Sequence, residues 1–321
     1  MTIVFIIALV AGAASATMFA SIISGALISL LLVYLAPLPL MVAAIAWGPL
    51  SAAIGGIGAS VVLGAIFGLP YGLAYAISVA LPAWWLGHLA LLGRPLAGAP
   101  STSGAAPDEL EWYPVGRILL WIVGFATLTT FAALLTLGAD ATAITATLRR
   151  FLQRILVRSE VVGSGEIEQW LDLLVIMAFA GAAIFSTMTL TLNLWLAAKV
   201  TATSGRLRRP WPDLRNAALP PMTLVLLCAG AAFCFSGGMV AIFAQIVTAA
   251  LIMAYAFTGF AVLHTLTLQL NSRLFWLCSA YAIVLAFEWP VIAVALLGMA
   301  DALFGFRARY LRTRPPPLPV A

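Results

Sequence analysis

Residues 35–92 read LAPLPLMVAAIAWGPLSAAIGGIGASVVLGAIFGLPYGLAYAISVALPAWWLGHLALL, and this stretch decides the fold. It contains no Asp, Glu, Lys or Arg, and His88 is the only side chain in it that titrates near neutrality. So long an apolar stretch is typical of a protein dissolved in a bilayer. It cannot be one helix, because each interior proline removes a backbone donor and clashes with the preceding turn. We therefore expect helices that fold back on one another and meet through small residues.

The composition of the 321-residue chain predicts a polytopic helical membrane protein. Hydrophobic residues make up 64% of it and charged residues 8%, whereas soluble domains carry about 25% charged residues. The mean hydropathy is +1.10. One crossing needs about 20 apolar residues, so the blocks from Ile3 to Phe304 supply roughly eight to ten passes. Because the alternation of an outer-membrane barrel is absent, we predict an all-α bundle with one amphipathic helix at the membrane surface.

The chain divides into four predicted regions. A Gly/Pro-rich helical bundle covers residues 1–94, a flexible loop covers 95–114, transmembrane helices cover 115–306, and a basic, Pro-rich tail covers 307–321. The amphipathic segment lies in the third region, at residues 140–169. It places Leu148, Phe151, Leu152, Ile155 and Leu156 on one side and Arg149, Arg150, Arg154 and Arg158 on the other. We interpret it as a helix along the membrane surface, with peptide or lipid binding as the alternative.

The first apolar run, residues 3–34, is predicted to be a single retained helix. Small residues recur along it every four positions, at Ala8, Gly12, Ala16 and Ala20. Such a row lets another helix approach closely. Two interpretations follow: the face packs against a helix of the same chain, or it docks a separate membrane protein subunit.

Positive charge indicates the orientation in the membrane. One short loop carries Arg206, Arg208, Arg209 and Arg215 against the single acid Asp213, and the tail carries Arg307, Arg309, Arg312 and Arg314. Both should face the cytoplasm of a bacterial inner membrane, which accounts for the net charge of +5 without a nucleic-acid partner. An even number of crossings must then separate them. Residues 274–304 would form a re-entrant or hairpin passage that turns at Glu288-Trp289-Pro290.

No motif predicts catalysis, a cofactor or a metal site, so we expect a protein that is not an enzyme. The three cysteines lie in apolar blocks and are interpreted as packing residues. Polar residues at membrane depth are the remaining candidates. Glu288 binds a ligand or caps a helix break, and Asn193 and Gln245 form interhelical hydrogen bonds or contact the same ligand. His88, beside Trp84 and Trp85, is either part of an interfacial anchor or a ligand contact.

Asp301 and Arg307 are predicted to form a structural clamp. Asp301 closes the last apolar block, and Arg307 follows it by six residues. The arginine can therefore fold back and pair with the carboxylate at the membrane interface.

Three strings, LPYGLAY at 69–75, LPAWWLG at 81–87 and LGMADALFGFR at 297–307, together with the Pro37–Pro49 segment, resemble the DUF2232 family of bacterial multi-pass membrane proteins. The first half of that family is similar to the substrate-binding S components of energy-coupling factor transporters and to the rod-shape protein MreD. The resemblance implies a helical bundle that can hold a central cavity. In S components a row of small residues on the first helix docks the coupling subunit, which the row beginning at Ala8 would match. The spans beyond Arg94 exceed a six-helix S component.

Two hypotheses follow. The first is an inner-membrane protein that binds or helps to move a small molecule, in a cavity between the N-terminal bundle and the Glu288 segment. The second is an envelope scaffold resembling MreD, which recruits partners through its small-residue helix face. In both, the lipid bilayer surrounds the chain.

Overall fold

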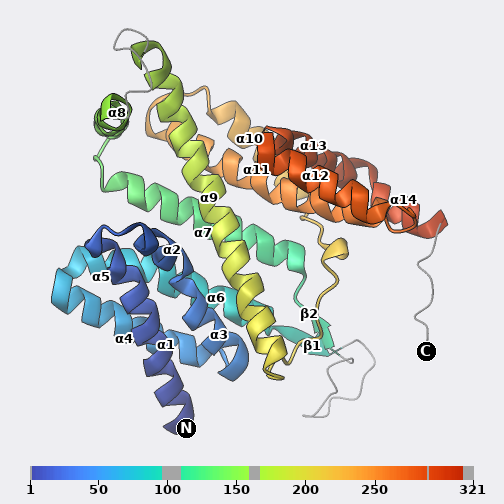
Figure 1. The fold of residues 1–321 in the computed structure, drawn as a ribbon, viewed down its shortest axis with the longest axis horizontal. Coiled ribbons are helices and arrows are strands. Elements are labelled where there is room, and N and C mark those ends of the chain that lie inside the picture. Colours follow the sequence, from blue (N-terminus) through green and yellow to red (C-terminus); the bar gives the residue numbers. More distant parts are fainter. Residues whose placement is uncertain (1, 96–109, 159–166, 288, 314–321) are drawn as a thin grey trace.

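The computed structural model describes residues 2–95, 110–158, 167–287 and 289–313, and nearly all of them are helical (Figure 1). The first half contains α1 (Thr2–Ala20), η1 (Ser21–Ser24), α2 (Leu27–Leu35), α3 (Pro37–Trp47), α4 (Pro49–Phe67), α5 (Leu69–Tyr75), the π-helical turn η2 (Ala76–Ala80) and α6 (Leu81–Ala90). Strands β1 (Gly93–Pro95) and β2 (Leu110–Trp112) follow. The second half contains α7 (Val115–Leu135), α8 (Ala141–Arg158), α9 (Ile167–Thr203), η4 (Leu214–Asn216), α10 (Met222–Phe233), α11 (Gly238–Leu266), α12 (Arg273–Phe287), α13 (Pro290–Phe304) and α14 (Phe306–Thr313).

This architecture confirms an all-α membrane bundle. Seven helical segments of the described chain are long and apolar enough to cross a bilayer, and an eighth is added if the bent pair α13–α14 counts as one. The short apolar helices α10 and α12 lie below that length. The number of candidate crossings, seven or eight, therefore lies at or just below the lower end of the predicted eight to ten.

The first apolar run is not one helix, contrary to the prediction for residues 3–34. It breaks after η1 at Gly25, whose φ of +67° is left-handed and favours glycine. The chain then reverses into α2, which continues across Ala36 into α3 as a single span, Leu27–Trp47. The run therefore supplies one crossing and part of the next.

Glycine and proline set the remaining breaks in the first half. Gly48 and Gly68 have φ of +104° and +97°, and each ends one helix directly before a helix with proline in its first turn. Pro82 lies inside the span Leu69–Ala90 without ending it. The preceding turn η2 is wider, with the Leu81 N–H bonded to the Ala76 carbonyl, which makes room for the proline ring.

The small-residue face of α1 packs against α4 of the same chain. A Cβ atom on Gly12 would overlap the backbone of Gly55, and one on Gly55 would overlap the Ala8 carbonyl. Ala8 and Ala16 are buried and Ala20 is half-buried. The part of the face around Gly12 is thus covered by a helix of the same chain, as the first of the two interpretations of this row predicts.

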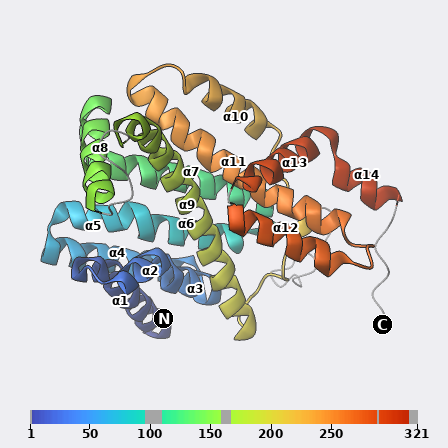
Figure 2. The same cartoon turned by 45° about the horizontal axis from the view of Figure 1, so that its top comes forward.

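In the second half, α11 is the central helix. A Cβ atom on Gly259 would overlap the Val294 carbonyl of α13, and one on Gly298 would overlap the Tyr255 carbonyl, so α11 and α13 cross backbone to backbone. Helices α12 and α13, each of 15 residues, are shorter than the ~20 needed for a crossing. Figure 2 shows α12 returning beside α11 and α13 leading back toward α14.

Three predicted segments fall partly outside the described residues. Residues 96–109 of the predicted loop are not described, but its flanks pair as strands, with Arg94 opposite Glu111. Helix α8 occupies the first part of the predicted amphipathic segment, and its Arg149 donates to Asp172 of α9 at 2.8 Å. The predicted tail begins as helix α14, bent by 66° from α13 at Gly305, where φ is +63°.

Candidate functional site

A cavity of about 720 Å³ lies where α7, α9 and α11 meet. Its walls are mainly apolar and include Ile118, Leu119, Leu194, Ala198, Phe257 and Ala261. The loop from Leu207 to Ala217 forms its rim. Along α7 the lining runs from Val115 to Ile122, so the cavity extends about 10 Å along the helix from the end that carries the basic loop. Its volume falls within the roughly 300–1,000 Å³ of small-molecule sites.

Contacts between arginines, tryptophans and backbone carbonyls hold the rim in place. The Arg206 guanidinium lies 4.7 Å from the ring centroid of Trp47 at the end of α3. Lys199, in the last turns of α9, lies 5.4 Å from the ring of Trp211. A Cβ atom on Gly116 would overlap the carbonyl of Ala218, so the end of the loop packs directly on the start of α7. The loop is therefore part of the bundle.

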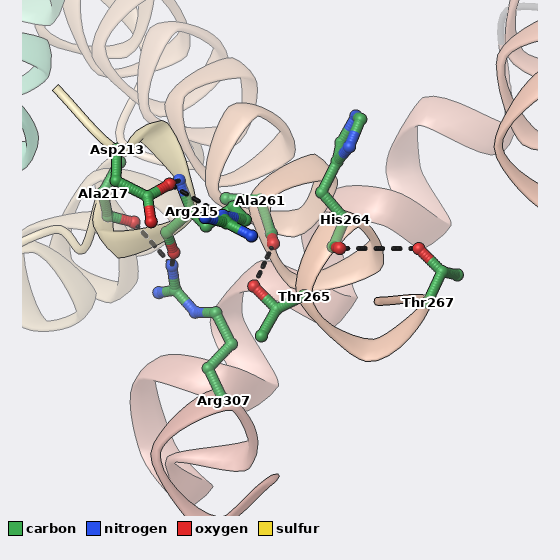
Figure 3. A network of polar contacts seen from close by, with 8 residues as sticks. All are labelled: Asp213, Arg215, Ala217, Ala261, His264, Thr265, Thr267 and Arg307. Carbon is green, nitrogen blue, oxygen red and sulfur yellow. Dashed lines mark hydrogen bonds and ion pairs between the residues drawn. The ribbon is translucent and has the colours of Figure 1, made fainter. Parts of the chain in front are cut away.

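Asp213 and Arg215 form an ion pair on the rim, with 2.8 Å between Nε and Oδ1 (Figure 3). Oδ1 of Asp213 also accepts the backbone N–H of Arg215 at 3.0 Å, which caps the short helix η4. These bonds to Arg215 lower the pKa of Asp213 and raise that of Arg215. Both groups are charged at neutral pH, and each neutralises the charge of the other.

The predicted clamp attaches the rim to the C-terminal helices. Arg307 Nε donates to Oδ2 of Asp301 at 2.7 Å, and its backbone N–H donates to Oδ1 at 2.9 Å. The same guanidinium donates from Nη1 to the carbonyls of Arg215 and Ala217 (Figure 3). The two side chains are only 6% and 12% exposed. The pairing expected from the sequence is present, and it extends to two carbonyls that the sequence did not indicate.

His264 and Tyr281 join α11 to α12 at the edge of the cavity. His264 Nε2 and the Tyr281 hydroxyl are 2.9 Å apart. The Tyr281 ring stacks on Phe260 with 4.8 Å between centroids. Thr258, also in the lining, donates to the carbonyl of Tyr255 at 2.9 Å. These polar groups of the wall thus have partners within the protein.

Arg209 differs from the other charged residues of the rim. Its Nη1 reaches the Ala90 carbonyl at 3.5 Å, which is a weak hydrogen bond. Its guanidinium lies 5.9 Å from the ring centroid of Trp112. No carboxylate of the described residues forms an ion pair with it. Burial lowers its pKa, because the charged form loses hydration that no anion replaces.

Asn193 is fully buried in α9 and forms an interhelical contact. Its Nδ2 donates to the Tyr34 carbonyl of α2 and to the Thr189 carbonyl, both at 2.8 Å. The carboxamide oxygen has no partner in the described part of the chain. Asn193 therefore connects α9 to the N-terminal half and lies outside the lining of the 720 Å³ cavity.

Gln245 lines a second cavity, of about 560 Å³, between α8, α9 and the start of α11. Its Oε1 is buried without a partner among the described residues. Thr142 of α8 and the Arg149–Asp172 pair line the same cavity. Gln245 and Asn193 are thus not hydrogen-bonded to each other, and each belongs to a different environment.

His88 lies in an aromatic cluster at the end of α6. Its ring centroid is 5.7 Å from that of Trp85, which is 5.1 Å from Trp121 of α7 and 5.5 Å from Trp84. His88 is half-buried and lines neither cavity. Glu288 lies outside the described residues. The three described candidates therefore lie in separate places, and the 720 Å³ cavity is lined by other residues.

Little in the sequence indicates this cavity. Ile45 and Ala90 of the N-terminal half and Tyr281 of the block that contains Glu288 contribute to it, but most of the lining belongs to α7, α9 and α11. The sequence predicts Arg209 only as part of the basic loop that indicates the orientation, and nothing local distinguishes it from Arg206 or Arg208.

Comparison of the chain with models of known families, with curated proteins and with solved structures yields no match. The similarity to DUF2232, S components and MreD therefore stays a prediction.

Proposed function

We propose that this integral membrane protein binds a small molecule in the 720 Å³ cavity and helps to move it between the membrane and the cytoplasmic face. The observation that supports the proposal is the cavity itself, whose apolar wall is built from three membrane-spanning helices and whose polar groups are few, with the charged ones on the rim. Because those groups, apart from Arg209, have partners within the protein, the arrangement favours binding over catalysis.

The rim is proposed to face the cytoplasm of a bacterial inner membrane. Within the described chain, every Lys and Arg outside α8 belongs to the end of the bundle that carries the loop from Leu207 to Ala217 and the start of α14. Lys and Arg are enriched on the cytoplasmic side of membrane proteins. A green fluorescent protein fused after α14 should then fluoresce, and alkaline phosphatase fused there should be inactive. The reverse pair of results would overturn this orientation.

The binding proposal is tested by filling the cavity. Ala198 lines it, and Ala198→Phe places a ring in its space, whereas Val200→Phe adds the same ring on the exposed face of α9. Both variants and the unaltered protein are purified in the same mild detergent, and small molecules that copurify are identified by mass spectrometry. We expect at least one species present in the unaltered protein and in Val200→Phe but depleted in Ala198→Phe.

Identical copurifying species in all three proteins would overturn the proposal, provided that Ala198→Phe elutes as a single species of normal size. Leu194→Trp, at another position of the wall, serves if Ala198→Phe does not fold. The scaffold hypothesis would then be the stronger one. The packing of Gly12 against α4 weighs against it, because the face proposed to recruit a partner is filled by the same chain.

A further inference from the structure

The charge at the rim of the cavity is positive and only partly neutralised. Among the described residues, Asp213 is the one carboxylate in the lining, and it is already paired with Arg215. Arg209 lines the same rim, is half-buried, and has a single weak hydrogen bond to Ala90. A guanidinium has five N–H donors, so most of those of Arg209 are available to an acceptor. A half-buried charge without an ionic partner is unfavourable, and an anion is the ligand that removes the penalty.

The wall of the cavity has the opposite character. Ile118 and Leu119 of α7, Leu194 of α9 and Phe257 of α11 present hydrocarbon to the space. A compact anion such as free phosphate would leave this apolar space unfilled. The site therefore combines a positive rim, at the end of the spanning helices, with an apolar interior about 10 Å deep.

We propose that the cavity takes an amphiphile with one anionic head, a phosphate or a carboxylate, which Arg209 binds at the rim while the apolar chain lies along α7, α9 and α11. This inference rests on the proposed binding function and adds the chemical class of the ligand. Arg215 contributes little, because Asp213 already neutralises it. The preference for an anion over a neutral amphiphile should therefore depend on Arg209.

The test compares two probes with the same chain, one with a charged head and one with a neutral head: a palmitic acid with a photoactivatable diazirine in its chain, and the methyl ester of that acid. The full-length protein in a neutral detergent is titrated with each probe and illuminated, and cross-linked peptides of α7, α9 and α11 are quantified by mass spectrometry. In the unaltered protein the acid should label these peptides at a concentration roughly tenfold or more below that of the ester, since a hydrogen bond between two charged groups is stronger than one to a neutral ester.

Arg209→Gln should remove the preference for the acid while leaving labelling by the ester unchanged. Arg208→Gln removes the same charge from the neighbouring, exposed position and should keep the preference. Arg209→Lys should restore part of it. Equal labelling by acid and ester in the unaltered protein, or a preference that Arg208→Gln and Arg209→Gln reduce alike, would overturn the inference.

The outcomes separate this inference from the proposed function. If neither probe labels the cavity at saturating concentration, binding itself fails; if both label it equally, the cavity binds but the assigned class is wrong. Competition then identifies the source of the anion. Displacement of the acid probe by phosphatidylglycerol, but not by phosphatidylcholine, would assign a lipid phosphate, and displacement by palmitate alone would assign a free fatty acid. Displacement by neither would contradict an anionic head at Arg209.

Discussion

Neutralising Asp301 should destabilise the protein more than neutralising any exposed carboxylate. The side chains of Asp301 and Arg307 are 6% and 12% exposed, and two hydrogen bonds, from Nε and from the backbone N–H of Arg307, reach the two carboxylate oxygens. Breaking a buried pair by removing one partner typically costs about 3–5 kcal/mol, because the other charge stays buried. For Asp301→Asn we expect at least about 3 kcal/mol, or a fall of roughly 6 °C or more in the apparent unfolding temperature.

The assay is thermal unfolding in one detergent at one heating rate, because membrane proteins often unfold irreversibly and apparent temperatures depend on the rate. Glu111→Gln is the control, since it breaks the exposed pair with Arg94, whose side chains are 50% and 77% exposed, and should give no measurable shift. The double variant Asp301→Asn/Arg307→Gln should lose less than the sum of the two single variants. Equal shifts for Asp301→Asn and Glu111→Gln would refute the reasoning.

Three further predictions follow from packing and charge. Gly259→Val should prevent the crossing of α11 and α13 and reduce the yield of monodisperse protein on size-exclusion chromatography, whereas Gly181→Val, whose Cβ meets no atom within 4 Å, should not. Gly12→Leu should separate α1 from α4 and lower the unfolding temperature, while Ala13→Leu on the exposed face should leave it unchanged. The pKa of Asp213 lies below its ordinary 3.8. The stabilisation from its ion pair is therefore fully present above that ordinary value and is lost as the pH falls through the lowered one. The difference in unfolding temperature between the unaltered protein and Asp213→Asn should be constant from pH 8 to about pH 5 and vanish in stronger acid.

The sequence predicted those features that depend on a short window of residues. Hydropathy averaged over the length of one helix identifies a membrane span without any information from distant residues. The membrane bundle and most of its spans could therefore be predicted. The clamp joins residues six positions apart across the Gly305 bend, which is also a local pattern. The break at Gly25 was missed because apolar residues continue on both sides of it, and nothing in hydropathy distinguishes a reversal of the chain from a continuous helix.

The cavity could not be predicted, because its lining comes from segments far apart in the chain and each residue is ordinary in its own helix. The sequence suggests that Asn193 pairs with a side chain on a neighbouring span such as Gln245, but its Nδ2 donates to two carbonyls, that of Thr189 in its own helix and that of Tyr34, 159 residues away. Polar residues at membrane depth are costly and often mark functional sites. In this protein, Asn193 joins two helices and Gln245 lines the second cavity. The positive charge beside the 720 Å³ cavity, Arg209, lies in a loop.

The C-terminal helices contact the residues around the cavity at two points, so ligand binding and the packing of these helices should depend on each other. Arg307 holds the carbonyls of Arg215 and Ala217 on the rim, and Tyr281 reaches His264 on the wall. A ligand in the cavity stabilises the arrangement to which it binds, and by linkage anything that loosens that arrangement weakens binding. Asp301 itself lies outside the lining, yet Asp301→Asn should retain less of the copurifying species than the unaltered protein after identical washing. Retention equal to that of the unaltered protein, together with a lowered unfolding temperature, would show that the clamp stabilises α13 and α14 without holding the rim in its binding position.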